Sequence, residues 1–193
     1  MISVGLTGGI GCGKTMVAEF FSILNVPVYN SDLQANVLME TDPMIQHQVV
    51  DLLGEKAYNG NKLNKQFVSK KIFSDQSLKN SLNKIIHHKV LEDFIEWREV
   101  NISKKYIIQE AAILFETDHY KIHDVMITVT CPIEIRKKRL EERGMSVTEI
   151  NSRMKNQWPD EKKVPLSDYI IINDEKESLI QQVLVIHKKL INS

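Results

Sequence analysis

Gly8-Gly9-Ile10-Gly11-Cys12-Gly13-Lys14-Thr15 is the stretch that decides the fold. It satisfies the pattern G-x-x-x-x-G-K-[ST], in which two glycines, a lysine and a hydroxyl residue stand at fixed offsets. An apolar run, Ile2 to Leu6, precedes it, and apolar residues at helical spacing from Thr15 to Leu24 follow it. A chance match in a glycine-rich turn would not bring both flanking elements. We therefore interpret the stretch as a phosphate-binding loop between a strand and a helix.

These residue types suit the phosphates of ATP. Glycines let backbone N–H groups turn inward without a Cβ clash, and the N-terminus of the following helix adds partial positive charge. We expect Lys14 to neutralise charge on the β- and γ-phosphates and the Thr15 hydroxyl to bind the Mg²⁺ carried by ATP. Cys12 is expected to contribute only its N–H group. The residues of this segment predicted to bind the nucleotide are Gly8, Gly9, Gly11, Cys12, Gly13, Lys14, Thr15 and Met16.

The composition suits one globular domain that needs no disulfide or structural metal, with 193 residues, 42% hydrophobic and 26% charged. The formal net charge is zero, so bulk electrostatics give no reason to expect a nucleic-acid or membrane partner. Cys12 and Cys131 are the only cysteines and have no metal-binding spacing, and no run of ~18 apolar residues suggests a membrane span. Since the first residues lack a basic leader, we predict a cytoplasmic protein. We also expect it to be a monomer or a weak homo-oligomer.

Strand and helix patterns alternate along the rest of the chain. The segments 106–108, 125–129 and 169–172 are nearly continuous apolar runs, typical of parallel strands buried on both faces, and Val26 to Asn30 is a further short strand. Residues 33–101 read instead as almost wholly helical, an insertion long enough to cover a substrate. The sequence therefore predicts an α/β fold, a P-loop NTPase-type parallel sheet flanked by helices.

The loop alone does not separate kinases from GTPases or motor ATPases. A GTPase needs Asn-Lys-x-Asp after an apolar strand, and neither Asn64-Lys65 nor Asn83-Lys84 is followed by that aspartate. Asp51-Leu52-Leu53-Gly54 imitates a GTPase switch motif, but no strand precedes it, so we interpret it as a helix end with a glycine cap. A motor ATPase usually has a strand ending in Asp-Glu, whereas the third strand here ends in Gln109-Glu110. The small size and the helical insertion favour a small-molecule kinase.

Several longer strings resemble the dephospho-CoA kinase family from one end of the chain to the other. The family's opening, L-T-G-G-I-G-x-G-K, stands here as Leu6 to Lys14 and is much more specific than a bare P-loop. The family strings L-N-x-I-x-H-P, P-L-L-F-E, R-x-x-x-Q and A-D-Y-V-I-x-N resemble, in that order, residues 82–88, 112–116, 153–157 and 167–173. Cys131 to Leu140 is similar to the family's helix before the lid. The chain departs from the pattern at Asn30, Asn36, His88 and Ala112.

This resemblance implies that ATP phosphorylates the ribose 3′-hydroxyl of dephospho-CoA, giving CoA and ADP with Mg²⁺ as cofactor, the last step of CoA biosynthesis. It implies a single P-loop kinase domain with a core of 1–32, 102–135 and 165–193, a helical acceptor-binding insertion over about 33–101 and a helical lid over about 136–164. Two alternatives stay open. One is another small-molecule kinase, for a nucleotide or shikimate-like acceptor, and the other is a nucleotide-binding switch without transferase activity.

Asp32 is expected to join Lys14 as a catalytic residue. It follows the second strand at its carboxyl end, where ligands gather in open α/β sheets, and its carboxylate could accept the hydroxyl proton or hold Mg²⁺ through water. The alternative is that Asp32 caps a helix from Leu33 to Met39.

Arg139 is the third expected catalytic residue. Arg136, Arg139 and Arg143 share one helix face, and a guanidinium closing on the transferring phosphoryl group would stabilise its charge. The alternative is a solvated face with ion pairs such as Glu134–Lys138.

The remaining candidates divide between nucleotide and acceptor. Arg153, in the lid, and Asn173, which the resemblance places beside the adenine, are expected to contact ATP. Glu110 could hold a water on Mg²⁺. Besides Asp32, the residues expected to bind the acceptor are His87, Leu114, Phe115 and Glu116, although a structural histidine and simple packing explain these positions equally well.

Overall fold

A computed structural model describes residues 1–192, and the chain divides into two compact units. Residues 1–30 and the chain from Val100 onward form the first unit, and Ser31–Glu99 form the second. These limits lie close to the insertion expected at 33–101, whose role in binding an acceptor stays a prediction.

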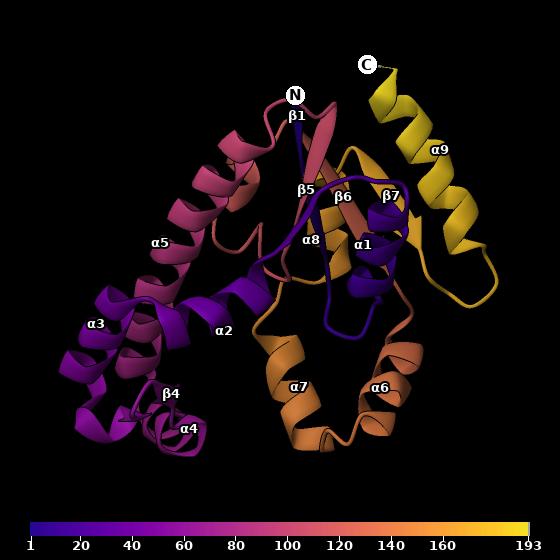
Figure 1. Cartoon of the computed structure of the whole chain (residues 1–193). Helices are drawn as coiled ribbons and strands as arrows, with labels where there is room; N and C mark the ends of the chain where they lie inside the picture. The colour runs from indigo at the N-terminus through magenta and orange to yellow at the C-terminus, as the bar shows by residue number, and fades with distance from the viewer. Residues whose placement is uncertain (193) are drawn as a thin grey trace. The chain divides into compact units, whose positions relative to one another are not determined.

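The first unit is built on a five-stranded parallel sheet (Figure 1). The strand order is β2 (Val28–Asn30), β5 (Tyr106–Glu110), β1 (Ile2–Gly8), β6 (Val125–Thr130) and β7 (Tyr169–Ile172). Every pair in it is parallel, and the register sets Leu6 of β1 beside Glu110 of β5 and Ile127 of β6. This confirms the α/β expectation.

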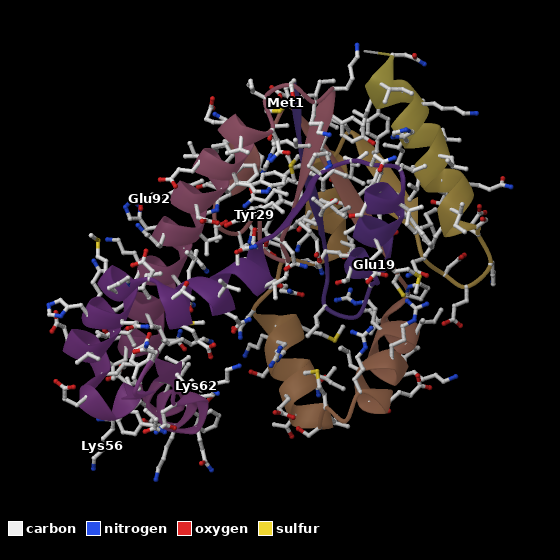
Figure 2. All side chains as sticks on the ribbon, in the orientation of Figure 1. Met1, Glu19, Tyr29, Lys56, Lys62 and Glu92 are labelled. Carbon is white, nitrogen blue, oxygen red and sulfur yellow. The ribbon has the colours of Figure 1, made fainter. Side chains whose placement is uncertain are left out.

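Helices α1 and α9 pack on each other and cover one face of this sheet. Their apolar side chains, such as Phe21 and Val183, meet alternate strand residues such as Leu6 and Ile127, all of which are buried. The helices of this unit are α1 (Lys14–Ile23), α6 (Ile133–Glu142), α7 (Val147–Lys155), α8 (Asp160–Lys163) and α9 (Leu179–Ile191), with short 3₁₀ turns η2 (His119–Ile122) and η3 (Val164–Leu166). Tyr29 of β2, labelled in Figure 2, is also buried.

The second unit is mostly helical and has its own apolar core. Its elements are α2 (Ser31–Thr41), α3 (Pro43–Leu53), η1 (Glu55–Ala57), the hairpin strands β3 (Tyr58–Asn59) and β4 (Lys62–Leu63), α4 (Lys65–Ser74) and α5 (Gln76–Val100). Ile45, Val49, Val68 and Leu82 are buried together at its centre. Gly54 ends α3 with a φ of 94°, which confirms that Asp51 to Gly54 is a helix end and not a switch.

One element of the second unit was not expected. Within the insertion expected to be almost wholly helical, the polar stretch Tyr58 to Asn61 is part of an antiparallel hairpin in which Tyr58 pairs with Leu63. Gly60 makes its turn with a φ of 61°, a left-handed conformation that glycine adopts without strain. Lys62 of β4 and Lys56, which precedes the hairpin, are labelled in Figure 2, and both are exposed. Within residues 1–192, no helix has the length and apolar character that crossing a bilayer requires.

Candidate phosphate-transfer site

The phosphate loop leaves β1 at the place where the connections of the sheet diverge. After β1 the chain passes to β2 on one side, and after β5 it passes to β6 on the other side of β1. In open parallel sheets ligands bind at such a switch point, outside the carboxyl ends of the strands. The loop after β1 and Glu110 at the end of β5 therefore meet at the edge where a ligand is expected.

The loop backbone takes conformations that need glycine. Gly11 and Gly13 have φ values of 79° and 92°, and Gly13 is the N-cap residue directly before α1. The first amide groups of a helix have no intrahelical acceptor, so those of Lys14 and Thr15 are donors for an anion. Cys12 differs from expectation, because its N–H closes a turn onto the Gly9 carbonyl at 3.2 Å.

Lys14, at the end of the loop, is buried, and its side chain reaches back to the start of the loop. Its Nζ donates to the carbonyl of Gly8 at 3.0 Å and to that of Gly9 at 3.4 Å. These carbonyls hold the ammonium group inside the loop, where a bound phosphate would meet it.

Gly8→Ala is expected to lower the free energy of unfolding by about 3 kcal/mol or more, from overpacking and backbone strain together. The added Cβ would lie 2.3 Å from the carbonyl oxygen of Val129, which the sheet holds in place, and φ at Gly8 is 151°. Urea unfolding measures the loss. Gly60→Ala is the matched control, since Gly60 also has a positive φ but nothing within 4 Å of its added Cβ, and it should lose only about 1 kcal/mol. Equal losses for the two variants would contradict the steric explanation.

Thr15, Glu110 and Asn30 form a polar cluster beside the loop. The Thr15 hydroxyl donates to Glu110 Oε1 at 3.4 Å, and the Asn30 amide donates to Glu110 Oε2 at 2.5 Å. Among residues 1–192, no three His, Cys, Asp or Glu side chains group as metal ligands. Magnesium carried by a nucleotide needs only one or two protein oxygens besides phosphates and water, so the hydroxyl of Thr15 and the carboxylate of Glu110 are donors of the right kind.

Arg139 and Asn173 are linked to each other and to the loop. The Arg139 guanidinium donates to Asn173 Oδ1 at 3.2 Å and to Glu175 Oε1 at 3.0 Å, and Asn173 Nδ2 donates to the Cys12 carbonyl at 2.8 Å. Gly13 fits beneath this pair, because a Cβ there would lie 2.3 Å from Asn173 Nδ2. The structure therefore brings together three of the sequence-predicted nucleotide elements: the loop, Arg139 and Asn173.

The other candidate arginines differ in how far they are buried. Arg136 is buried, its Nε donates to the carbonyl of Ile10 at 2.9 Å, and its Nη1 lies 3.7 Å from Asp160 Oδ1. Arg143 lies at the end of α6 and Arg153 on α7, and both are exposed. Their contacts with a phosphate stay predictions.

Glu134 forms an ion pair on α6 with a different lysine from the one named for the solvated-face alternative. Glu134 pairs with Lys137 at 3.5 Å, three residues along the helix, whereas the solvated-face alternative gave Lys138 as an example of its partner. Residues at i+3 and i+4 are both neighbours on a helix face, so the sequence could not choose between them.

The segment 114–116 makes its contacts with other residues of the first unit. Leu114 and Phe115 are buried together with Met126, and the Phe115 ring stacks on Trp158 with ring centroids 6.4 Å apart. Glu116 Oε1 accepts from the backbone N–H of Trp158 at 2.7 Å and pairs with the fully buried Lys163 at 2.8 Å. These contacts match the packing alternative, and their role toward an acceptor stays a prediction.

Lys163→Met is expected to cost about 3–5 kcal/mol of unfolding free energy, because it leaves the Glu116 carboxylate without its buried partner. The side chain of Lys163 is 0% exposed, and its Nζ also donates to the carbonyl of Ala112 at 3.3 Å. Adding Glu116→Gln removes the orphaned charge and should recover part of the loss. Lys188→Met, at an exposed position of α9, is the control and should unfold like the wild type in urea. A loss below about 1 kcal/mol for Lys163→Met would contradict the buried pair.

Asp32 and His87 belong to the second unit. Helix α2 begins at Ser31, so Asp32 lies in its first turn and is exposed, and the alternative that Asp32 caps a helix beginning at Leu33 is wrong. The backbone carbonyl of Asp32 accepts a hydrogen bond from Asn36 Nδ2 at 2.8 Å, so this contact involves the backbone of Asp32 and not its carboxylate. His87 is half-buried on α5. Their catalytic and acceptor-binding roles stay predictions.

Comparisons with known proteins identify relatives that are kinases, as the phosphate loop suggests. The family model described as dephospho-CoA kinase matches residues 2–178. The dephospho-CoA kinase of Bacteroides fragilis (strain YCH46) is 36% identical over 184 residues, which cover 95% of this chain and 90% of that protein.

Solved structures share the fold. A protein from Thermus thermophilus superimposes with a TM-score of 0.85 at 24% identity, covering 97% of this chain and 96% of its own. The dephospho-CoA kinase from Campylobacter jejuni superimposes with a TM-score of 0.73 at 19% identity, covering 98% and 97%. The family match spans most of the sequence and includes the whole phosphate loop, so the chain belongs to the dephospho-CoA kinase family.

Proposed function

We propose that this enzyme transfers the γ-phosphoryl group of ATP to the ribose 3′-hydroxyl of dephospho-CoA, giving CoA and ADP in the last step of CoA biosynthesis. The observation that carries the proposal is the family match over residues 2–178, which includes a complete phosphate loop. The loop accounts for the donor from its own chemistry, and the family match accounts for the acceptor.

The transfer is direct. The oxygen of the 3′-hydroxyl forms a bond to the γ-phosphorus, the bond from that phosphorus to the β–γ bridging oxygen breaks, and ADP leaves. The proton of the hydroxyl goes to the carboxylate of Asp32. Lys14, the first amides of α1 and Arg139 stabilise the negative charge on the phosphoryl group in transit.

Magnesium bound with ATP would neutralise charge between the β- and γ-phosphates. The Thr15 hydroxyl is assigned as its oxygen ligand, and Glu110, which accepts from that hydroxyl at 3.4 Å, is assigned to hold a water on the ion. Arg153 and the segment 136–164 are assigned to a lid that keeps water from accepting the phosphoryl group.

The second unit is assigned to bind the acceptor, through His87 and Asp32. The residues of the first unit assigned to contact the acceptor are Leu114, Phe115 and Glu116. Asn173 is assigned to the adenine of ATP. No nucleic-acid or membrane partner is proposed, and the enzyme is proposed to act in the cytoplasm as a monomer or weak homo-oligomer.

Phosphorus NMR and mass spectrometry of the reaction products test the proposal. With ATP, Mg²⁺ and dephospho-CoA, the expected products are ADP and CoA that carries a 3′-phosphate monoester. Release of inorganic phosphate with dephospho-CoA unchanged would overturn the proposal in favour of a nucleotide hydrolase or switch.

A further inference from the structure

Both polar backbone groups of one loop residue, Ile10, are bound by side chains from a distant segment. The Ile10 N–H donates to Gln157 Oε1 at 2.7 Å, and the Ile10 carbonyl accepts from Arg136 Nε at 2.9 Å. Arg136 lies on α6 and Gln157 just after α7, more than a hundred residues along the chain. The loop is therefore held in its first half by this segment as well as by its own turn.

Arg136 is well suited to this contact. A planar guanidinium can direct Nε to a carbonyl and Nη1 to the Asp160 carboxylate at the same time, which a lysine cannot do. Its charge is buried, and burial needs such a partner. The guanidinium packs so closely on Gly9 that only a glycine fits there, since a Cβ on Gly9 would lie 2.1 Å from Arg136 Nη2. The guanidinium thus lies against the loop backbone.

Gln157 is presented from an anchored stretch of backbone. Its own N–H donates to the Met154 carbonyl at 3.2 Å, and the next residue, Trp158, is held through its N–H by Glu116 and through its ring by Phe115. The side-chain oxygen therefore reaches Ile10 from a stretch of backbone that is itself held in place, and Gln157 is half-buried.

We propose that Gln157 and Arg136 are positioning residues that fix the Ile10 peptide and so hold the phosphate loop in its nucleotide-binding shape. They act through Ile10 and do not bind phosphate themselves. A loop ordered before the ligand arrives loses less conformational entropy on binding, so these contacts raise the affinity for ATP. The inference rests on the proposed function for its donor, ATP, and not for its acceptor.

Gln157→Met tests this, because methionine keeps the length of the side chain and removes the acceptor oxygen. We expect hydrogen exchange at the Ile10 amide of the free protein to speed up about tenfold, as for a donor that has lost its bond. The KM for ATP should rise about tenfold, with kcat at saturating ATP within about twofold of wild type, as expected when ground-state and transition-state binding are lost equally. Gln46→Met, at a glutamine of the second unit that donates to the Glu40 carbonyl, is the matched control and should change neither quantity.

Gln157→Glu separates the hydrogen bond from side-chain volume. A glutamate offers an acceptor oxygen at the same reach, so protection of the Ile10 amide should return, while its added negative charge keeps ATP binding weak. Unchanged exchange and unchanged KM for ATP in Gln157→Met would overturn the proposal. So would tighter ATP binding by that variant, since Gln157 would then compete with phosphate for the amide. Failure of the wild type to phosphorylate dephospho-CoA would count against the proposed acceptor and would leave these measurements intact.

Discussion

Lys14→Ala is expected to lower kcat for phosphoryl transfer by about 10²–10³-fold, the cost of removing one preorganised donor from a developing anion. The ammonium group is buried and held by the carbonyls of Gly8 and Gly9, so it is already in place when the phosphates arrive. Alanine removes that charge and leaves the loop amides and Arg139 to stabilise the phosphoryl group. Steady-state kinetics with ATP and dephospho-CoA measure the loss, and circular dichroism checks the fold.

Lys188→Ala is the matched control, because Lys188 is exposed on α9 and away from the loop in sequence. It should turn over at the wild-type rate. A Lys14→Ala variant that keeps wild-type kcat and KM would contradict the assignment of the loop as the ATP site.

Asp32→Asn is expected to lower kcat by about 10²–10⁴-fold, the range for loss of general-base help. Asparagine keeps the shape of the side chain and removes its ability to take the hydroxyl proton. Because Asp32 lies exposed in the first turn of α2, the change should leave the fold and the affinity for ATP unaltered. Pre-steady-state quenched flow and ATP titration separate the two quantities.

Asp51→Asn is the control for that prediction, since Asp51 is an exposed carboxylate on α3 paired only with His47 at 3.4 Å among the ion pairs of the described residues. It should keep wild-type kcat. If Asp32→Asn also keeps wild-type kcat, Asp32 does not act as the base.

The features that could be predicted from sequence are those with local causes. The phosphate loop has its glycines, Lys14 and Thr15 within eight residues, and the apolar runs 106–108 and 125–129 can hardly be anything but buried strands. The helix end at Gly54 could also be predicted from local sequence, because a glycine that follows an apolar helical pattern commonly caps the C-terminus of the helix.

The features that could not be predicted depend on where distant segments meet. Lys163 stands in the run Asp160 to Lys163, which has the composition of a solvated surface, yet its side chain is fully buried against Glu116. Arg136 was one of three similar arginines, and only the fold directs it to Ile10. No spacing in the sequence signals either contact, since each joins residues tens to more than a hundred positions apart.

Comparison of acceptors under one set of conditions tests the central claim most directly. ADP release by the wild-type enzyme would be followed with saturating ATP and Mg²⁺ and with dephospho-CoA, AMP or shikimate as acceptor. The account predicts a kcat/KM for dephospho-CoA that exceeds the others by orders of magnitude. Fastest turnover with AMP or shikimate would contradict it.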